Sequence, residues 1–255
     1  NGPIMFEGGA VATILANNLL YRGGLIAARS LMPTGRGLAD QFGQKIMDER
    51  LTVKNYTNKK EYNGTPLYGY YEVDGDGVTP EPEIVLVEKG VFKKMLNGRI
   101  PALKAPETTG SSRFLMSPQS PTLVTGTGTI HVQAEKGMAH EKMKKLLIKT
   151  AKAAGQSYAY IVRGISGSAL VVYRVDLKDG KETRVRTTGF RMPELTKLLK
   201  LVAVSSKEGV MNYLPNAYPA SMIYPAGIIV DGMVIEKANP KTEKEPALKL
   251  PRQRD

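Results

Sequence analysis

The stretch GPIMFEGGAVATILANNLLY, residues 2–21, predicts a β-strand that leads directly into an amphipathic helix. The helical part covers about residues 8–21, with two asparagines in its middle and a tyrosine at its end. Its apolar side chains recur at helical spacing and form one stripe, made of Val11, Ile14, Leu15 and Leu19. We therefore expect this stripe to pack in the core of the protein.

Turn signals at short intervals indicate that strands dominate the rest of the chain. Alternating runs flank Asp179-Gly180 in LVVYRVDLKDGKETRVRTTGF, and two more runs flank Lys89-Gly90, so we predict a hairpin at each pair. Two further helices are expected, over about residues 138–153 and from Pro193 to about residue 202. Because strands and helices do not alternate as βαβ units, the sequence predicts an α+β fold, with mostly antiparallel β-sheet and a few amphipathic helices.

The chain has 255 residues, which is long enough for one large domain, and we assign residues 1–238 to it. Residues 239–255 are rich in Pro and Lys and are predicted to form an extended basic tail. No apolar run approaches the roughly 18 residues that a membrane-spanning helix needs. The sequence has no first methionine and no signal-peptide pattern, so we expect that residue 1 is not the natural start of the gene product.

The amino-acid composition excludes several kinds of functional site. Cysteine is absent, which excludes disulfides, thiolate metal sites and a thiol nucleophile. The net charge of +12 raises a nucleic-acid-binding alternative. Much of that charge lies on helix faces and in the tail, and no P-loop, zinc-finger or RNA-binding signature accompanies it. A solvated basic surface is the better interpretation, whereas tight DNA binding with a steep salt dependence would favour the alternative.

Four stretches, taken in their order, resemble the TldD/PmbA (TldE) family, whose members were described as modulators of DNA gyrase and are regarded as metallopeptidases. They are GPIMFEGGAVATIL (2–15), LTVKNYTNKKEYNGTPLYGYYEVDGDGV (51–78), LVEKGVFKKMLNGRIPALKAPETTGSSRF (86–114) and YPASMIYPAGIIVDGMVIEKA (218–238). Each block is short, and it is their order that is specific. The resemblance corresponds to the C-terminal half of a family member, and it implies that the family's N-terminal domain is absent from this chain.

In catalytic members, the resemblance places an HExxxH motif on the first helix, where two histidines and a later cysteine bind zinc and the glutamate acts as general base. Histidines five residues apart need a widened, π-type turn to meet. The motif positions fall here on Ala16, Asn17 and Tyr21, and the cysteine has no counterpart. A methyl group offers no ligand atom, an amide is no useful base, and a tyrosine would bind zinc only as the phenolate. We expect a non-catalytic, TldE-like pseudoenzyme without a cofactor, zinc being confined to catalytic relatives.

Two alternatives would retain an activity. A rebuilt metal site would have to use His131 and His140, but His140-Glu141 is followed by Lys144 where HExxH has its second histidine. We expect His131 to be a half-exposed strand residue and His140 to lie at the surface where a helix begins. The second alternative is an active metallopeptidase subunit whose ligands come from a missing domain or a partner chain. A serine hydrolase is not indicated, because the stretch GISGS (164–168) lacks the G-x-S-x-G pattern.

The resemblance implies that unfolded peptide binds to this chain by adding as a strand to an exposed sheet edge. The candidate peptide-binding residues lie in a glycine-rich loop and in the TGSSR turn, which matches the family's TG-n-R block, and they are Gly35, Arg36, Gly37, Thr109, Gly110 and Arg113. Arg113 could hold a peptide carboxylate. The alternative is that the TGSSR block simply ties a loop to the sheet.

The resemblance further implies a protein that takes part in proteolysis or peptide processing as one of two subunits. It favours a cytoplasmic location, and an exported form is the alternative, because a chain without cysteine suits either compartment. We expect a homodimer, or a heterodimer with a TldD-like catalytic subunit, and no membrane span. The stretch MNYLPNAYPASMIYP, residues 211–225, is the candidate interface because it is rich in Tyr and Met. Burial of the same stretch within the monomer is the alternative.

Overall fold

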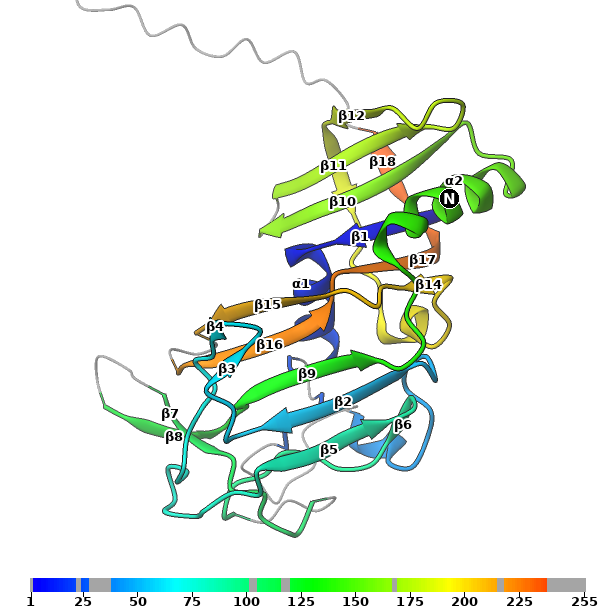
Figure 1. Ribbon diagram of the computed structural model, residues 1–255. Coiled ribbons are helices and arrows are strands. Elements are labelled where there is room, and N and C mark those ends of the chain that lie inside the picture. Colours follow the sequence, from blue (N-terminus) through cyan, green and yellow to red (C-terminus); the bar gives the residue numbers. More distant parts are fainter. Residues whose placement is uncertain are drawn as a thin grey trace, which may run out of the picture.

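The computed structural model describes residues 2–21, 24–27, 38–100, 105–115, 120–166, 169–214 and 218–237. Two six-stranded β-sheets form most of the molecule, and helix α1 (Gly9–Leu19) lies between them (Figure 1). Helix α2 (His140–Ala153) packs on the other face of the first sheet. The predicted α+β fold is confirmed, and antiparallel pairing predominates, with parallel pairing where β1 meets β10 and where β9 meets β16.

The first sheet has the order β12-β11-β10-β1-β17-β14. Its strands are β12 (Glu182–Val185), β11 (Ala169–Asp176), β10 (Tyr158–Ser166), β1 (Gly2–Glu7), β17 (Gly227–Met233) and β14 (Ala203–Val204). The predicted hairpin at Asp179-Gly180 is confirmed, since it joins β11 to β12. Gly180 has a φ of 73°, a left-handed conformation that glycine adopts without strain.

The second sheet has the order β15-β16-β9-β2-β5-β6. Its strands are β15 (Glu208–Tyr213), β16 (Ala220–Pro225), β9 (Thr129–Ala134), β2 (Leu51–Tyr56), β5 (Glu83–Glu88) and β6 (Val91–Phe92). Three short ribbons and two 3-10 helices complete the described part: β3 (Glu61–Tyr62) with β4 (Thr65–Pro66), β7 (Ser112–Leu115) with β8 (Thr122–Thr125), β13 (Thr187–Phe190) with β18 (Ile235–Lys237), η1 (Leu38–Gln41) and η2 (Leu195–Leu198). The predicted hairpin at Lys89-Gly90 is confirmed between β5 and β6.

Strand β1 is buried on both of its faces. Ile4 and Phe6 point into the larger core, which also contains the apolar stripe of α1. Met5 points the opposite way, into a smaller core with Met143 and Leu147 of α2. Because successive side chains of a strand alternate between faces, this one short apolar strand joins both cores. The predicted burial of residues 11, 14, 15 and 19 is confirmed.

The helix predicted from Pro193 to about residue 202 is wrong in extent, because only the 3-10 helix η2 forms there. The cause lies in competing hydrogen bonds. The carbonyl oxygen of Leu198 accepts a bond from Asp48 N at 2.8 Å, and Leu201 N donates to Asp48 Oδ2 at 2.8 Å. These backbone groups therefore bond to the turn before β2 and cannot continue a helix.

Burial within the monomer, the alternative for the stretch 211–225, is confirmed for Tyr218 and for β16, all of whose residues are buried. The prediction of an interface is therefore wrong for this strand, whose Tyr and Met side chains fill the core. Residues 211–213 are partly exposed, and Leu214 is 65 % exposed. None of the described helices is long and apolar enough to span a membrane.

Candidate functional site

Helix α1 ends in a widened turn at the three positions that the resemblance identifies. The carbonyl oxygen of Ala16 accepts hydrogen bonds from Leu20 N at 2.9 Å and from Tyr21 N at 3.1 Å. The second of these bonds joins residues five apart, as in a π-type turn. A turn of this type is what a pair of histidines at residues 16 and 21 would require.

The side chains at these positions do not suit a metal centre. Ala16 is buried and ends in a methyl group, Asn17 is half-buried and neutral, and Tyr21 is 41 % exposed. Within the described ranges, no three His, Asp or Glu side chains gather as metal ligands do. The backbone of the turn is thus compatible with the family motif, but the residues that it carries do not fit zinc.

We expect the purified protein to retain far less than one zinc ion per chain after dialysis, because Ala16 and Tyr21 supply no imidazole ligands. Elemental analysis measures this directly. A variant with Ala16→His, Asn17→Glu and Tyr21→His tests the alignment of the motif, and it should bind added zinc more tightly than the wild type. Retention of about one equivalent by the wild-type chain would contradict the expectation.

Buried Tyr218 and half-buried Tyr213 lie beside the end of α1. Tyr213, the last residue of β15, and Tyr218 are both within electrostatic range of Tyr21. Burial raises the pKa of Tyr213 and Tyr218, so both phenols are neutral at physiological pH. Thr127 N donates to the Tyr218 hydroxyl at 3.3 Å. The hydroxyl groups of Thr127 and Tyr213 are neighbours, but no hydrogen bond with good geometry is formed by either oxygen within the described part of the chain.

Arg113, on strand β7, is the predicted site residue with the most unusual surroundings. It is only 8 % exposed, and its guanidinium carbon lies 4.1 Å from the ring centroid of Tyr71 and 5.6 Å from that of Tyr218. Its Nη2 donates to the carbonyl oxygen of Pro219 at 3.0 Å. Burial lowers the pKa of Arg113, and the nearby charge of Asp74 opposes this effect. The cation is therefore held by aromatic faces and a carbonyl group.

The other two predicted residues of the TGSSR turn build the loop that carries Arg113. The Thr109 hydroxyl accepts a bond from Asn97 N at 2.7 Å and lies 2.9 Å from Asn97 O. Gly110 has a φ of 62°, and a Cβ atom there would lie 2.8 Å from Pro80 Cα. Tyr71 donates its hydroxyl proton to Gly110 O at 2.9 Å, so the turn also positions the ring beneath Arg113. The predicted residues Gly35, Arg36 and Gly37 lie outside the described residues.

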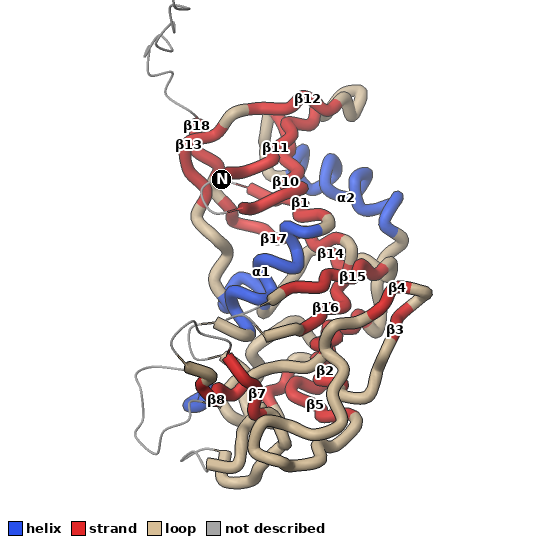
Figure 2. Tube along the Cα trace, turned by 90° about the vertical axis from the view of Figure 1, so that its left-hand side faces the viewer, coloured by secondary structure: helices blue, strands red, loops and turns tan. Residues whose placement is uncertain are grey.

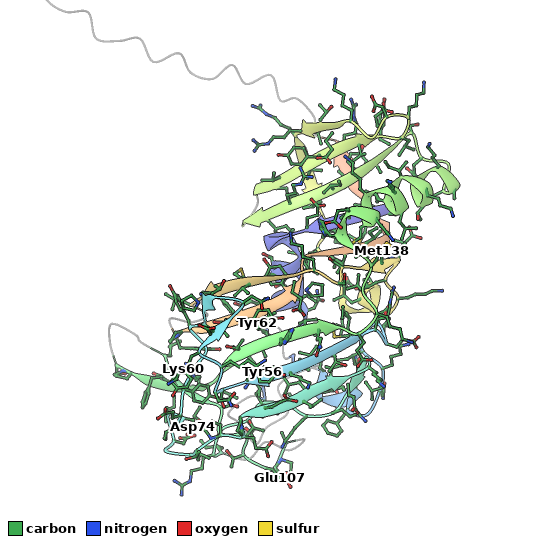
Figure 3. The ribbon with its side chains drawn as sticks, viewed as in Figure 1. Tyr56, Lys60, Tyr62, Asp74, Glu107 and Met138 are labelled. Carbon is green, nitrogen blue, oxygen red and sulfur yellow. The ribbon has the colours of Figure 1, made fainter. Side chains whose placement is uncertain are left out.

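A pocket of about 310 Å³ opens beside Arg113. Its lining consists of Val73, Asp74, Gly75, Ser112, Arg113, Phe114, Tyr218 and Pro219. Figure 2 shows β7 and β8 beside the end of the second sheet, and Figure 3 shows Asp74 at the same end. Sequence reasoning identified Arg113 but missed Tyr71 and Tyr218, since their only signal was the abundance of tyrosine.

The two histidines occupy separate structural positions. His131 lies on β9 in the second sheet, where its Nε2 is 2.7 Å from Glu208 Oε1. His140 begins α2 beside the first sheet, with its Nε2 3.3 Å from Glu7 Oε1. The prediction that His131 is half-exposed is wrong, because the β3–β4 hairpin brings Tyr62 over it and leaves it 6 % exposed. Figure 3 shows Tyr62 lying over this face of the sheet.

The two sheets of the mixed α+β fold enclose helix α1, and the last turn of this helix has the π-type bond at the motif positions. The family described as the PmbA/TldA metallopeptidase C-terminal domain matches residues 1–237. The chain therefore belongs to the TldD/PmbA family, which confirms the resemblance found in the sequence.

Two solved structures share the fold. TldE from Thermococcus kodakarensis is 18% identical with a TM-score of 0.61, and the match covers 93% of this chain and 50% of that chain. A proposed modulator of a DNA gyrase from Thermotoga maritima MSB8 is 14% identical with a TM-score of 0.56, over 90% of this chain and 49% of that chain. The chain thus spans about half the length of these relatives. No curated protein sequence is similar enough to match.

Proposed function

We propose that this chain is a metal-free, non-catalytic subunit that binds unfolded peptide alongside a TldD-like catalytic subunit. The observation that carries the proposal is the end of α1, where a π-type turn is present but Ala16, Asn17 and Tyr21 stand at the positions of the motif. A chain that has the fold of the family but lacks the zinc ligands and the general base can still bind peptide and assemble with a partner. Membership of a metallopeptidase-related family makes peptide the fitting ligand class.

Strand β15 is the edge that we propose for the peptide. It is the first strand of the second sheet and pairs with β16 alone in the described part of the chain. All six of its residues are partly exposed. In an antiparallel pair, alternate residues direct their backbone N–H and C=O groups away from the partner strand. An extended peptide can bond to these groups without reference to its own sequence.

Side-chain contacts hold β15 at this edge. On one face, Glu208 accepts a hydrogen bond from the Tyr62 hydroxyl, and Asn212 Nδ2 donates to Pro66 O at 2.8 Å. These bonds join β15 to the β3–β4 hairpin. On the other face, Met211 and Tyr213 pack against the larger core. The described residues therefore cover both faces of the strand, and none of the described strands pairs with its outer edge. The edge ends at Tyr213, close to Tyr21 and the end of α1.

We expect an unfolded peptide to bind with an affinity that depends on its backbone. Methylation of every backbone amide nitrogen should weaken binding at least about tenfold, because it removes the donors and blocks strand pairing along both edges of the peptide. A scrambled peptide of the same composition should bind nearly as well as the original. Fluorescence anisotropy with labelled peptides measures both values. Unchanged binding of the fully methylated peptide would contradict β-addition.

A further inference from the structure

Arg113 carries a buried positive charge that no carboxylate of the described residues balances by direct contact. Its side chain forms no salt bridge with any of them, and Pro219 O is the single hydrogen-bond acceptor that they supply. A guanidinium has five N–H donors, so most of its donors remain for another group. Buried charges are ordinarily paired. The arginine therefore has the properties of one half of an ion pair whose other half comes from a ligand.

Asp74 is the nearest candidate partner, but its oxygens are already committed to backbone donors. Its Oδ1 accepts bonds from Asp76 N at 2.9 Å and Val78 N at 2.8 Å, and its Oδ2 accepts one from Ser112 N at 3.0 Å. These bonds fix the turn at residues 74–78 and hold it against Ser112, the first residue of β7. Asp74 influences Arg113 through electrostatics alone. Burial lowers the pKa of Arg113 despite this influence, and an incoming anion would offset the cost of burying the cation.

The lining of the pocket combines the cationic Arg113 with apolar side chains. Phe114 is 51 % exposed and Val73 is 55 % exposed, although both line the pocket. A volume of about 310 Å³ is at the lower end of the range for small-ligand sites, and it suits one amino-acid residue. The pocket thus offers a charged fork for a carboxylate and an exposed apolar surface for a neighbouring side chain.

The geometry points to recognition of the free C-terminal residue of an unfolded peptide, with its α-carboxylate on Arg113 and its side chain against Phe114 and Val73. This inference rests on the proposed peptide-binding function and specifies its substrate class. A terminal residue combines a carboxylate with a side chain and continues the backbone in one direction only, which suits a pocket of single-residue size. Planar guanidinium groups bind carboxylates in a bidentate manner, which gives such a contact its specificity.

The position of the pocket relates it to the β15 edge. The Tyr218 ring lies 5.6 Å from the Arg113 guanidinium carbon, and Tyr218 is in turn within electrostatic range of Tyr213 at the end of β15. A peptide whose C-terminus is held at Arg113 would therefore meet the Tyr213 end of the edge first. Anchoring at one end would set the direction and register of a strand that backbone pairing alone leaves undetermined.

The test compares three peptides of one sequence with an apolar last residue. The first has a free C-terminus, the second a C-terminal amide, and the third a C-terminal amide with an internal glutamate. We expect the wild-type chain to bind the free acid at least about tenfold more tightly than either amide, because a charge-assisted bidentate pair is lost. Equal binding of acid and amide would overturn the inference. So would full recovery of affinity by the internal glutamate, which would assign the site to side-chain carboxylates.

Variants identify the residue responsible. Arg113→Gln should abolish the preference for the free acid, and Arg113→Lys should retain a smaller one because lysine lacks the fork. Arg99→Gln is the matched control, since Arg99 is exposed and should leave the preference unchanged. Circular dichroism checks that each variant is folded, and the peptide comparison on wild type needs no variant at all. If methylation of every backbone amide weakens binding while acid and amide bind equally, the proposed function stands and this inference fails.

Discussion

Replacing Leu15 with aspartate is expected to lower the free energy of unfolding by at least about 4 kcal/mol. Leu15 is 1 % exposed and lies on the face of α1 that packs in the larger core between the two sheets. The substitution would remove a large apolar side chain and bury an unpaired carboxylate, at a cost of at least about 4 kcal/mol. Domains are commonly stable by only about 5–15 kcal/mol, so a loss of this size is a large fraction of the total and should lower the urea midpoint strongly.

Urea denaturation followed by circular dichroism measures the loss. Thr13→Asp is the matched control on the same helix, because Thr13 is only half-buried and its hydroxyl donates to Gly9 O at 2.9 Å. This control should shift the midpoint only slightly. A Leu15→Asp protein with the wild-type midpoint would show that α1 contributes little to the core, and the assignment of the two-sheet core would then fail.

Local patterns in the sequence predicted the elements whose stability is itself local. The stripe of α1 follows from helical spacing, and the turns at Lys89-Gly90 and Asp179-Gly180 follow from residues that accept a left-handed backbone. The helix after Pro193 failed because Asp48, far away in the sequence, takes the backbone bonds that the helix would need. Propensity at one place could not reveal a competitor from another.

The candidate site could be predicted only in part, for the same reason. The TGSSR motif identified Arg113, but its aromatic partners Tyr71 and Tyr218 come from separate segments that the fold brings together. Likewise, His131 has the alternating pattern of a half-exposed strand, and its burial depends on the short hairpin that carries Tyr62. Chemistry that depends on one segment was visible in the sequence, whereas chemistry that depends on several segments required the structure.

Removing the charge of Asp48 is expected to cost about 2–3 kcal/mol at neutral pH. Asp48 is 5 % exposed and accepts hydrogen bonds from Arg50 Nε and Arg50 Nη2, each at 2.8 Å, and from Leu201 N. Arg50 Nη2 also donates to Leu201 O at 2.6 Å. These bonds join the start of β2 in the second sheet to the segment that leads into β14 of the first. Asp48→Asn keeps the shape of the side chain, but its NH2 group would face the N–H donors of Arg50 and Leu201 and could not accept their hydrogen bonds.

The cost of Asp48→Asn should depend on pH in a defined direction. Burial alone would raise the pKa of Asp48, but the bonds from Arg50 and Leu201 N outweigh it and hold the pKa below its usual value. A carboxyl group whose pKa is depressed in the folded state stabilises the protein at pH values above its unfolded-state pKa of about 4. This contribution is lost as the pH falls through the pKa of the folded state.

The difference in unfolding free energy between wild type and Asp48→Asn should therefore be constant from neutral pH down to about pH 5 and shrink in more acidic solution. Glu49→Gln is the matched control, since Glu49 is exposed and its pairing with Lys45 at the surface contributes little. Urea titrations at a series of pH values give both differences. A gap that stays constant to about pH 2, or one that widens in acid, would mean that the Asp48 carboxylate does not join the two sheets through its charge.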